Sequence, residues 1–347
     1  MAKEGLLATT LWFEQVEANY SAPKARLDSL RIMRDIGISV MPVSNPRNIN
    51  SQLRVAYGSG DVVSFVQYPL KPWFNITDED FSTPYKVAEQ IMVASTKTVL
   101  ILHDIKHLQA TMFDKVVSSG LIARIEAFER FLFSSVDAVI CHSSPMSAYL
   151  ESEFGLRNVV SIVLFDYLCS NAVPFANPAE TNDFVFAGYL GRNKRSLVRR
   201  LSESFDTLRR GLDLYGPDFD FPQLKSSLIR YMGSVHPDLL PSFLAHRYLA
   251  GIIWDELNEN QRTYYRLIAP HKASAYLAAG LPIVAPRDTY IGDFVSDHSI
   301  GFSIDDLSHI GRLDDLLGAV DFETLRRMQI KVRNGHHLKE AIKKVLE

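Results

Sequence analysis

The chain has 347 residues, of which 47% are hydrophobic and 22% charged, which is the composition of a globular protein in water. This length exceeds what one core usually holds, so two domains are expected. A net charge of −3 argues against a general nucleic-acid binder. No apolar run approaches the roughly 20 residues that span a bilayer, and the start of the chain does not read as a signal peptide. We therefore expect a cytoplasmic protein.

Strand-like and helical segments alternate along the first half of the chain. The expected strands cover residues 6–12, 38–43, 61–66, 98–102, 137–141 and 159–164. The expected helices cover residues 23–36, 84–94, 121–133 and 145–153. This alternation predicts a parallel sheet with helices on both faces, which is an α/β fold.

Polar residues stand where these expected strands end, and ligands of parallel sheets bind at that edge. They are Asn19 and Ser21 in the loop after the first strand, then Gln67, Tyr68, His103, Asp104 and His142. Such groups suit the recognition of hydroxyls and the transfer of a proton. Either His103 or Asp104 could act as a general base, and the alternative is that they only cap the loop that follows.

The second half repeats the alternation after a loop-like connection at residues 166–183, which contains Pro174 and Pro178. Its expected strands cover residues 184–187, 212–214, 249–254, 281–285 and 300–304, and its expected helices 197–208, 239–244, 270–279, 290–295 and 321–346. The predicted division is therefore an N-terminal domain at 1–165, a linker at 166–183 and a C-terminal domain at 184–330. A C-terminal helix at 331–347 can pack back on the N-terminal domain.

The turn from Gly188 to Lys194 follows a strand and opens a helix. Its glycines allow the backbone to approach a ligand closely, although their spacing is not that of the dinucleotide fingerprint. Arg192 is the residue best suited to a bidentate phosphate contact. The alternative is an ordinary strand–helix turn.

Pro270-His271-Lys272 opens a second helix of interest. Pro270 fits the first helical position, Gly280 can end the helix, and a cation beside free backbone N–H groups can hold an anion. The alternative is an amphipathic helix whose Lys272 is solvated. Together with Arg192, Lys194 and Tyr215, this helix start predicts an environment for a diphosphate.

No metal site is expected from the sequence. The two Asp-x-Asp triplets, Asp78-Glu79-Asp80 and Asp218-Phe219-Asp220, fall in polar loops and are interpreted as solvated. The histidines and the two cysteines, Cys141 and Cys169, do not have zinc-ligand spacing. Both cysteines are expected to be buried free thiols.

Ordered motifs over nearly the whole chain resemble those of GT-B glycosyltransferases. They are Asn19-Tyr20-Ser21-Ala22-Pro23-Lys24-Ala25-Arg26, Gln67-Tyr68-Pro69-Leu70, His103-Asp104-Ile105, Asp137-Ala138-Val139-Ile140-Cys141-His142, Leu164-Phe165-Asp166-Tyr167-Leu168, Phe186-Ala187-Gly188-Tyr189-Leu190, Leu214-Tyr215-Gly216 and the stretch from Tyr264 to Val284. More narrowly, the chain resembles a bacterial group of adhesin-modifying glucosyltransferases and β-1,6-galactofuranosyltransferases. The resemblance implies two Rossmann-like domains that face each other across a cleft.

The resemblance also implies a UDP-sugar held by the C-terminal domain without a metal. Carried over to this sequence, Arg192 and Lys272 meet the diphosphate, while Tyr215, Gly216 and the loop before Pro270 hold the nucleoside. The nucleotide-sugar set is completed by Gly188, Lys194, Asp255, Tyr265, His271 and Tyr276. The acceptor side consists of Asn19, Ser21, Gln67 and Tyr68, with His103 and Asp104 as the catalytic residues.

The chain departs from this group just before the second helix, where Ile268-Ala269 replaces a polar Asn-Asn pair. The two glutamates of retaining GT-B enzymes are also absent around Lys272, which favours inversion. We therefore expect an inverting transferase that moves a glucose- or galactofuranose-type sugar from a UDP-sugar to a glycan hydroxyl, in cell-surface polysaccharide or glycoprotein assembly.

Two alternatives to this transferase remain open. One is a non-catalytic GT-B subunit that binds a glycan or a partner transferase. The other is a sugar-nucleotide epimerase with the same two-domain shape. The expected partners are the UDP-sugar and the acceptor glycan. The basic C-terminal helix also carries Glu323, Glu340 and Glu347, so it is interpreted as a solvated face, and peripheral contact with the inner membrane face is the alternative. A homo-oligomer is left open.

Overall fold

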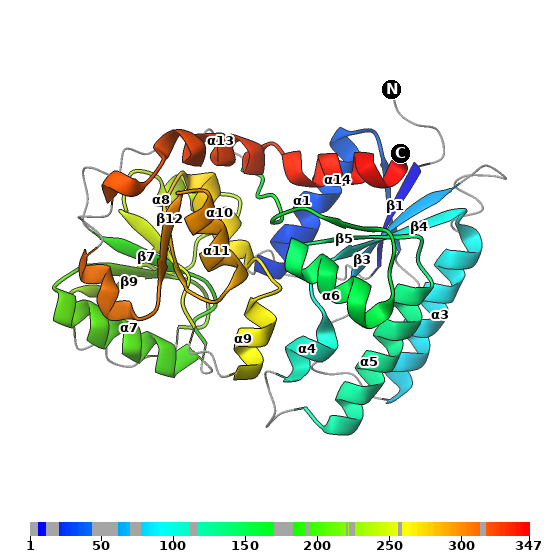
Figure 1. Cartoon of the computed structure of the whole chain (residues 1–347), viewed down its shortest axis with the longest axis horizontal. Helices are drawn as coiled ribbons and strands as arrows, with labels where there is room; N and C mark the ends of the chain where they lie inside the picture. The colour runs from blue at the N-terminus through cyan, green and yellow to red at the C-terminus, as the bar shows by residue number, and fades with distance from the viewer. Residues whose placement is uncertain are drawn as a thin grey trace. The chain divides into compact units, whose positions relative to one another are not determined.

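The computed structural model describes residues 6–11, 21–43, 62–69, 78–111, 117–169, 183–191, 194–219, 221, 226–255, 259–312 and 317–347. The chain divides into two compact units (Figure 1). The N-terminal unit contains Met1–Val16, Ser29–Val163 and Leu338–Glu347, and the C-terminal unit contains Glu17–Asp28 and Leu164–His337. The sequence-based division assigned all of residues 1–165 to one domain, whereas the structure groups Glu17–Asp28 with the C-terminal unit. No described helix combines the length and apolarity that a membrane crossing requires.

The N-terminal unit is built on a six-stranded parallel sheet. Its strands are β1 (Leu6–Leu11), β2 (Ser39–Val43), β3 (Val63–Tyr68), β4 (Lys97–Leu102), β5 (Ala138–Cys141) and β6 (Val159–Ser161). Their order is β2-β1-β3-β4-β5-β6, so the direction of strand addition reverses between β1 and β3. Strands β3, β4 and β5 are almost wholly buried, as their continuous apolar sequences predict.

The helices of the N-terminal unit correct two expectations. They are α1 (Ser21–Asp35) and α14 (His336–Leu346), which each continue into the C-terminal unit, with α3 (Asp78–Ala94), α4 (Lys106–Thr111), α5 (Ser119–Ser134) and α6 (Ser144–Phe154). Asp78-Glu79-Asp80 is the first turn of α3 and not a loop, because acidic residues favour a helix N-terminus. The short helix α4 was not predicted.

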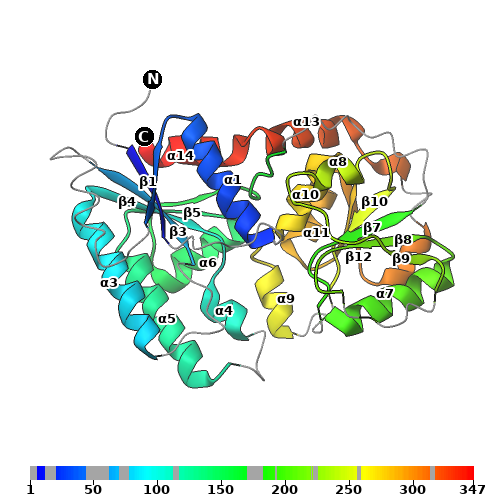
Figure 2. The same cartoon turned by 180° about the vertical axis from the view of Figure 1, so that it is seen from behind.

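The C-terminal unit has a second six-stranded parallel sheet, visible in Figure 2. Its strands are β7 (Phe184–Ala187), β8 (Leu212–Tyr215), β9 (Ile229–Tyr231), β10 (Ala250–Ile252), β11 (Ile283–Pro286) and β12 (Gly301–Ile304). Their order, β12-β11-β10-β7-β8-β9, is the doubly wound order of nucleotide-binding sheets, and it reverses between β7 and β10. Ligands of such sheets bind in the crevice at that reversal. A binding site is therefore expected among the residues that follow β7 and β10.

Helix α10 (His271–Ala279) is the central helix of this unit. The others are α7 (Arg195–Leu208), α8 (Leu240–Leu244), α9 (Glu259–Tyr265), α11 (Tyr290–Asp297) and α13 (Phe322–Arg333). Every residue from Ala273 to Ala279 is buried, and α10 packs against both α8 and α13. Gly280, with φ 74°, ends the helix as predicted, whereas Pro270 is the capping residue before it rather than its first residue.

Candidate functional site

Lys272, in the first turn of α10, brings its ammonium group to the carboxyl end of β7. Its Nζ lies 4.4 Å from the ring centroid of Phe186 and 3.6 Å from the position that a Cβ on Gly188 would take. No hydrogen bond or ion pair of Lys272 exists within the part of the chain that the structure describes. Because Gly188 has no side chain, there is room next to the Lys272 ammonium group. Among the described residues, no carboxylate forms an ion pair with that ammonium group.

Burial lowers the pKa of Lys272 to about 8, and the nearby charge of Lys194 lowers it further, against the opposing effect of Asp255. A desolvated ammonium group is costly to keep charged unless an anion compensates it. The site is therefore electrostatically complementary to a ligand that carries negative charge.

Lys194 and Asp255 form an ion pair next to Lys272. Lys194 follows β7 and Asp255 follows β10, so the pair straddles the point where the strand order reverses. The hydroxyl of Tyr265, at the end of α9, donates to the same Asp255 oxygen at 3.1 Å. The structure therefore brings together four residues that the sequence predicted for nucleotide-sugar binding, namely Lys194, Asp255, Tyr265 and Lys272.

Two tyrosines predicted to contact the nucleotide-sugar support the fold instead. Tyr276 is fully buried, and its hydroxyl accepts from the N–H of Ala187 at 2.8 Å and donates to the carbonyl of Ile252 at 3.1 Å, which ties β7 to β10. Tyr215 is buried, and its hydroxyl lies 2.9 Å from that of Tyr248. Direct contact of these two side chains with a ligand is therefore corrected to a supporting role.

His271 and Gly216 also have structural explanations. The imidazole of His271 stacks on the ring of Tyr167 at 4.9 Å, and its Nε2 donates to the carbonyl of Asp166 at 3.2 Å. A Cβ on Gly216 would lie 1.7 Å from the carbonyl oxygen of Gly188. Glycine at 216 thus permits the turns after β7 and β8 to meet.

In the N-terminal unit, His103 follows β4 and is held on three sides. Its Nε2 donates to Oε1 of Gln67 at 2.7 Å, and its N–H donates to the carbonyl of Tyr68 at 2.9 Å. Its own carbonyl accepts from Nε2 of His142 at 2.5 Å. Donation from Nε2 makes Nδ1 the acceptor nitrogen of the neutral imidazole. Asp104 comes next and is half-buried.

Gln67 and Tyr68 lie within β3 rather than after it, and both are fully buried. A direct contact with the acceptor, as the sequence predicted, is therefore replaced by support of neighbouring groups. Gln67 orients the imidazole of His103, while the hydroxyl of Tyr68 donates to Oε1 of Glu129 at 2.8 Å.

Sequence reasoning missed Glu129 and His107. Glu129 belongs to α5 and is fully buried among Ile125, Phe128 and Leu132. Nδ1 of His107 donates to Oε2 of Glu129 at 2.5 Å. The signal in the sequence was a glutamate in the apolar stripe of an amphipathic helix, where a charged group requires hydrogen-bond partners.

Some predicted residues lie outside what the structure describes. Asn19, Arg192 and Asp220 are among them, and Ser21 is described only as the first residue of α1. Within the described residues, no group of three or more histidines, cysteines, aspartates and glutamates is arranged to hold a metal ion.

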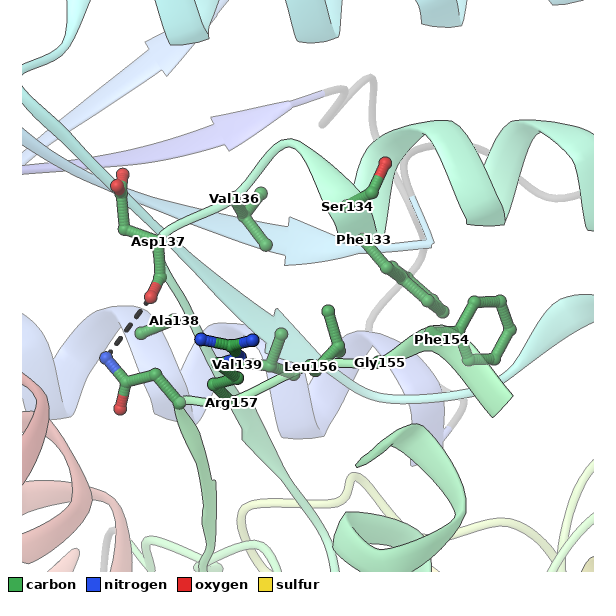
Figure 3. Close-up of a pocket in the computed structure, with 11 residues that line it drawn as sticks. Phe133, Ser134, Val136, Asp137, Ala138, Val139, Phe154, Gly155, Leu156 and Arg157 are labelled. Atoms are coloured by element: carbon green, nitrogen blue, oxygen red, sulfur yellow. Dashed lines mark hydrogen bonds between the residues drawn. The ribbon is translucent and has the colours of Figure 1, made fainter. Parts of the chain in front are cut away.

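A hollow of about 270 Å³ lies at the amino end of β5, as Figure 3 shows. It is lined by Phe133, Ser134, Val136, Asp137, Ala138, Val139, Phe154, Gly155, Leu156, Arg157 and Asn158. His103 follows β4, which runs parallel to β5, so the hollow lies at the opposite edge of the sheet. It is separate from the candidate residues.

Comparison with known proteins places these features in context. Residues 184–345 match a domain family described as "Glucosyltransferase 3-like, C-terminal domain". Beta-1,6-galactofuranosyltransferase WbbI of Escherichia coli (strain K12) is 23% identical over 229 residues, which are 62% of this chain and 64% of that protein. Glucosyltransferase 3 of Streptococcus gordonii is 22% identical over 297 residues, which are 84% of this chain and 80% of that protein.

Solved structures share the fold over almost the whole chain. Sucrose-phosphate synthase from Thermosynechococcus elongatus matches with a TM-score of 0.60 and 12% identity, covering 99% of this chain and 98% of that one. Anabaena Alr3699/HepE in complex with UDP-glucose matches with a TM-score of 0.56 and 11% identity, with coverage of 99% and 98%. The resemblance to GT-B glycosyltransferases that the sequence indicated is confirmed.

Proposed function

We propose that the chain is a glycosyltransferase that transfers a hexose from a UDP-sugar to a glycan hydroxyl. The proposal is supported by the match of residues 184–345 to the glucosyltransferase 3-like C-terminal domain and by the fold shared with sucrose-phosphate synthase. The transferred sugar is of the glucose or galactofuranose type, in line with the named relatives. The product belongs to cell-surface polysaccharide or glycoprotein assembly.

The observation that carries this proposal is the ammonium group of Lys272. It is a desolvated cation beside Gly188 and the Lys194–Asp255 pair, at the strand-order reversal where nucleotides bind in such sheets. A diphosphate supplies the negative charge that this environment lacks. Lys272, together with the predicted contact of Arg192, stabilises the charge that develops on the leaving UDP.

In the proposed reaction, the acceptor oxygen forms a bond to the anomeric carbon as the bond from that carbon to the diphosphate oxygen breaks. The proton of the acceptor hydroxyl goes to His103 or Asp104 in the N-terminal unit. One displacement inverts the anomeric configuration. Lysine and arginine neutralise the leaving group in place of a metal, so we propose a metal-independent enzyme.

A donor screen tests the function. Purified protein is incubated with UDP-glucose, UDP-galactose, UDP-galactofuranose and UDP-GlcNAc, and hydrolysis and transfer to candidate acceptors are measured by mass spectrometry with and without EDTA. The proposal expects one UDP-sugar to be consumed regardless of EDTA, with inversion visible by NMR. Absence of both UDP binding and transfer with every donor would reject it.

The second candidate, a non-catalytic subunit, is disfavoured by the ordered hydrogen bonds around His103. A Lys272→Ala variant that complements a deletion strain fully would support the subunit. An epimerase would convert the UDP-sugar without an acceptor, so product analysis in the absence of acceptor separates it.

We also propose cytoplasmic action with peripheral contact to an anionic membrane face. Helix α13 exposes Arg326, Lys331 and 51% of Ile330 on its surface, and such a face attracts anionic lipid. Co-sedimentation with phosphatidylglycerol vesicles but not phosphatidylcholine vesicles is expected, and it should weaken in Lys331→Glu. Light scattering tests the proposed homo-oligomer.

A further inference from the structure

The buried carboxylate of Glu129 accepts four hydrogen bonds. Oε1 accepts from the hydroxyl of Tyr68 at 2.8 Å and from the N–H of Lys106 at 2.6 Å. Oε2 accepts from the N–H of His107 at 3.1 Å and from its Nδ1 at 2.5 Å. All four partners are donors, so an ionised carboxylate satisfies each of them and a neutral side chain does not.

These bonds fix a short backbone segment that carries the two proposed catalytic residues. Lys106 and His107 lie in the first turn of α4, and only Ile105 separates this turn from His103 and Asp104. The other end of the segment is held by the N–H of His103, which donates to the carbonyl of Tyr68. The side chain of Tyr68 donates to Glu129 itself, so one carboxylate ties the end of β3 to the start of α4.

We propose that Glu129 is a positioning residue that holds His103 and Asp104 in the geometry for proton transfer. The inference rests on the proposed function, since it concerns the base of that reaction. Glu129 is completely buried, so it cannot contact a substrate and can act only through its hydrogen-bond partners. A displacement of about 1 Å at a reacting group can cost about a hundredfold in rate, so the loss of this anchor should be visible in kcat.

Glu129→Gln is the informative variant because it keeps the shape of the side chain. The NH₂ group of glutamine replaces one acceptor oxygen, so at least one of the four N–H or O–H donors then faces another donor. That hydrogen bond is lost. Glu126→Gln, on the same helix, is the matched control, because the Glu126 side chain is 38% exposed and pairs only with Arg130 among the described residues. We expect kcat to fall at least tenfold in Glu129→Gln and less than twofold in Glu126→Gln, while the Kd for UDP is unchanged in both.

A double-mutant cycle separates positioning from a loss of folding. The cycle uses whichever of His103→Ala and Asp104→Asn lowers kcat more. If Glu129 acts through the base, adding Glu129→Gln to that variant lowers kcat by less than a further twofold. A full additional tenfold loss in that background, or an unchanged kcat in the single variant, overturns the proposal. Should Glu129→Gln fail to fold, Tyr68→Phe removes one of the four hydrogen bonds and is expected to lower kcat about threefold at unchanged Kd for UDP.

A measurement that needs no activity distinguishes this inference from the function it rests on. In protein labelled with ¹⁵N-histidine, the imidazole signals of His103 and His107 should move in Glu129→Gln and stay in Glu126→Gln. If these signals move while the wild type transfers no sugar, the proposed function is wrong, although Glu129 still fixes the position of His103. If sugar is transferred and the His103 signal does not move, the positioning role is wrong.

Discussion

The carboxyl edges of the two sheets differ in how many hydrogen-bond and ion-pair partners their charged and titratable groups have. At the edge of the C-terminal unit, Lys272 is desolvated and has no ion-pair partner among the described residues. At the edge of the N-terminal unit, His103 has its ring, its N–H and its carbonyl all hydrogen-bonded. The first edge therefore holds a cation without a compensating charge among the described residues, whereas the groups of the second edge are already held by hydrogen bonds.

This contrast fits the division of labour in the proposed reaction. A diphosphate brings its own charge, so a receptor with an uncompensated cation gains from binding it. A general base must instead be held in place before the substrate binds, because proton transfer depends on hydrogen-bond geometry. The contrast yields predictions that separate binding at one edge from catalysis at the other.

The largest effect is expected at the N-terminal edge. His103→Ala and Asp104→Asn are compared separately, and removal of the base should lower kcat by about 10²- to 10⁴-fold. The Kd for UDP should not change, because nucleotide binding is assigned to the other unit. Steady-state kinetics with calorimetric measurement of UDP binding checks both statements. If neither variant loses more than twofold in kcat, the base lies elsewhere.

The next largest effect is expected at Lys272. Lys272→Ala removes a charged hydrogen-bond partner of the diphosphate, which is worth about 1.5–3 kcal/mol, so the Kd for UDP should rise about tenfold to a hundredfold. Lys331→Ala, on the exposed surface of α13, is the control and should bind UDP normally. Equal Kd values for the wild type and Lys272→Ala would remove this lysine from the donor site.

A smaller effect distinguishes Gly188, which lies beside Lys272, from Gly216, which lies against Gly188. In Gly216→Ala, the new Cβ would meet the Gly188 carbonyl oxygen at 1.7 Å, so the backbone must move, and we expect a loss of about 2 kcal/mol of unfolding free energy. In Gly188→Ala, the nearest atom is Nζ of Lys272 at 3.6 Å, so stability should be kept while UDP binding weakens a few-fold. Urea unfolding measures the stability of both variants, and calorimetry measures their Kd for UDP. A larger loss of stability in Gly188→Ala than in Gly216→Ala would contradict the geometry.

Much of this architecture follows from sequence pattern. Alternating apolar segments predicted eleven of the twelve strands in the described residues, and Gly280 and the small residues after Pro270 predicted α10. The sequence missed α4, α9 and β9, because such short elements form through tertiary packing and carry little periodicity of their own.

Some candidate residues could be predicted from their position in the sequence, whereas others depend on side-chain orientation and tertiary contacts. Lys194 and Asp255 were predicted because residues after parallel strands converge in space, and Lys272 was predicted because it stands in the first turn of a helix. Tyr276 and Tyr215 were assigned to the ligand because sequence position does not reveal which way a hydroxyl points, and both proved to be buried supports. Glu129 was missed because its role depends on four donors from distant parts of the chain.

The most direct test of the account is the pH dependence of UDP binding above pH 7, where the terminal phosphate of UDP is largely ionised. The pKa of Lys272 is lowered to about 8 in the free protein, and binding favours the charged ammonium. Protonated lysine predominates below that pKa, so affinity should be high there and fall up to tenfold per pH unit above it. Calorimetry from pH 7 to 9.5 should show this decline in the wild type and a nearly flat, weak profile in Lys272→Ala. A profile that is flat in the wild type, or equally steep in Lys272→Ala, would contradict the account.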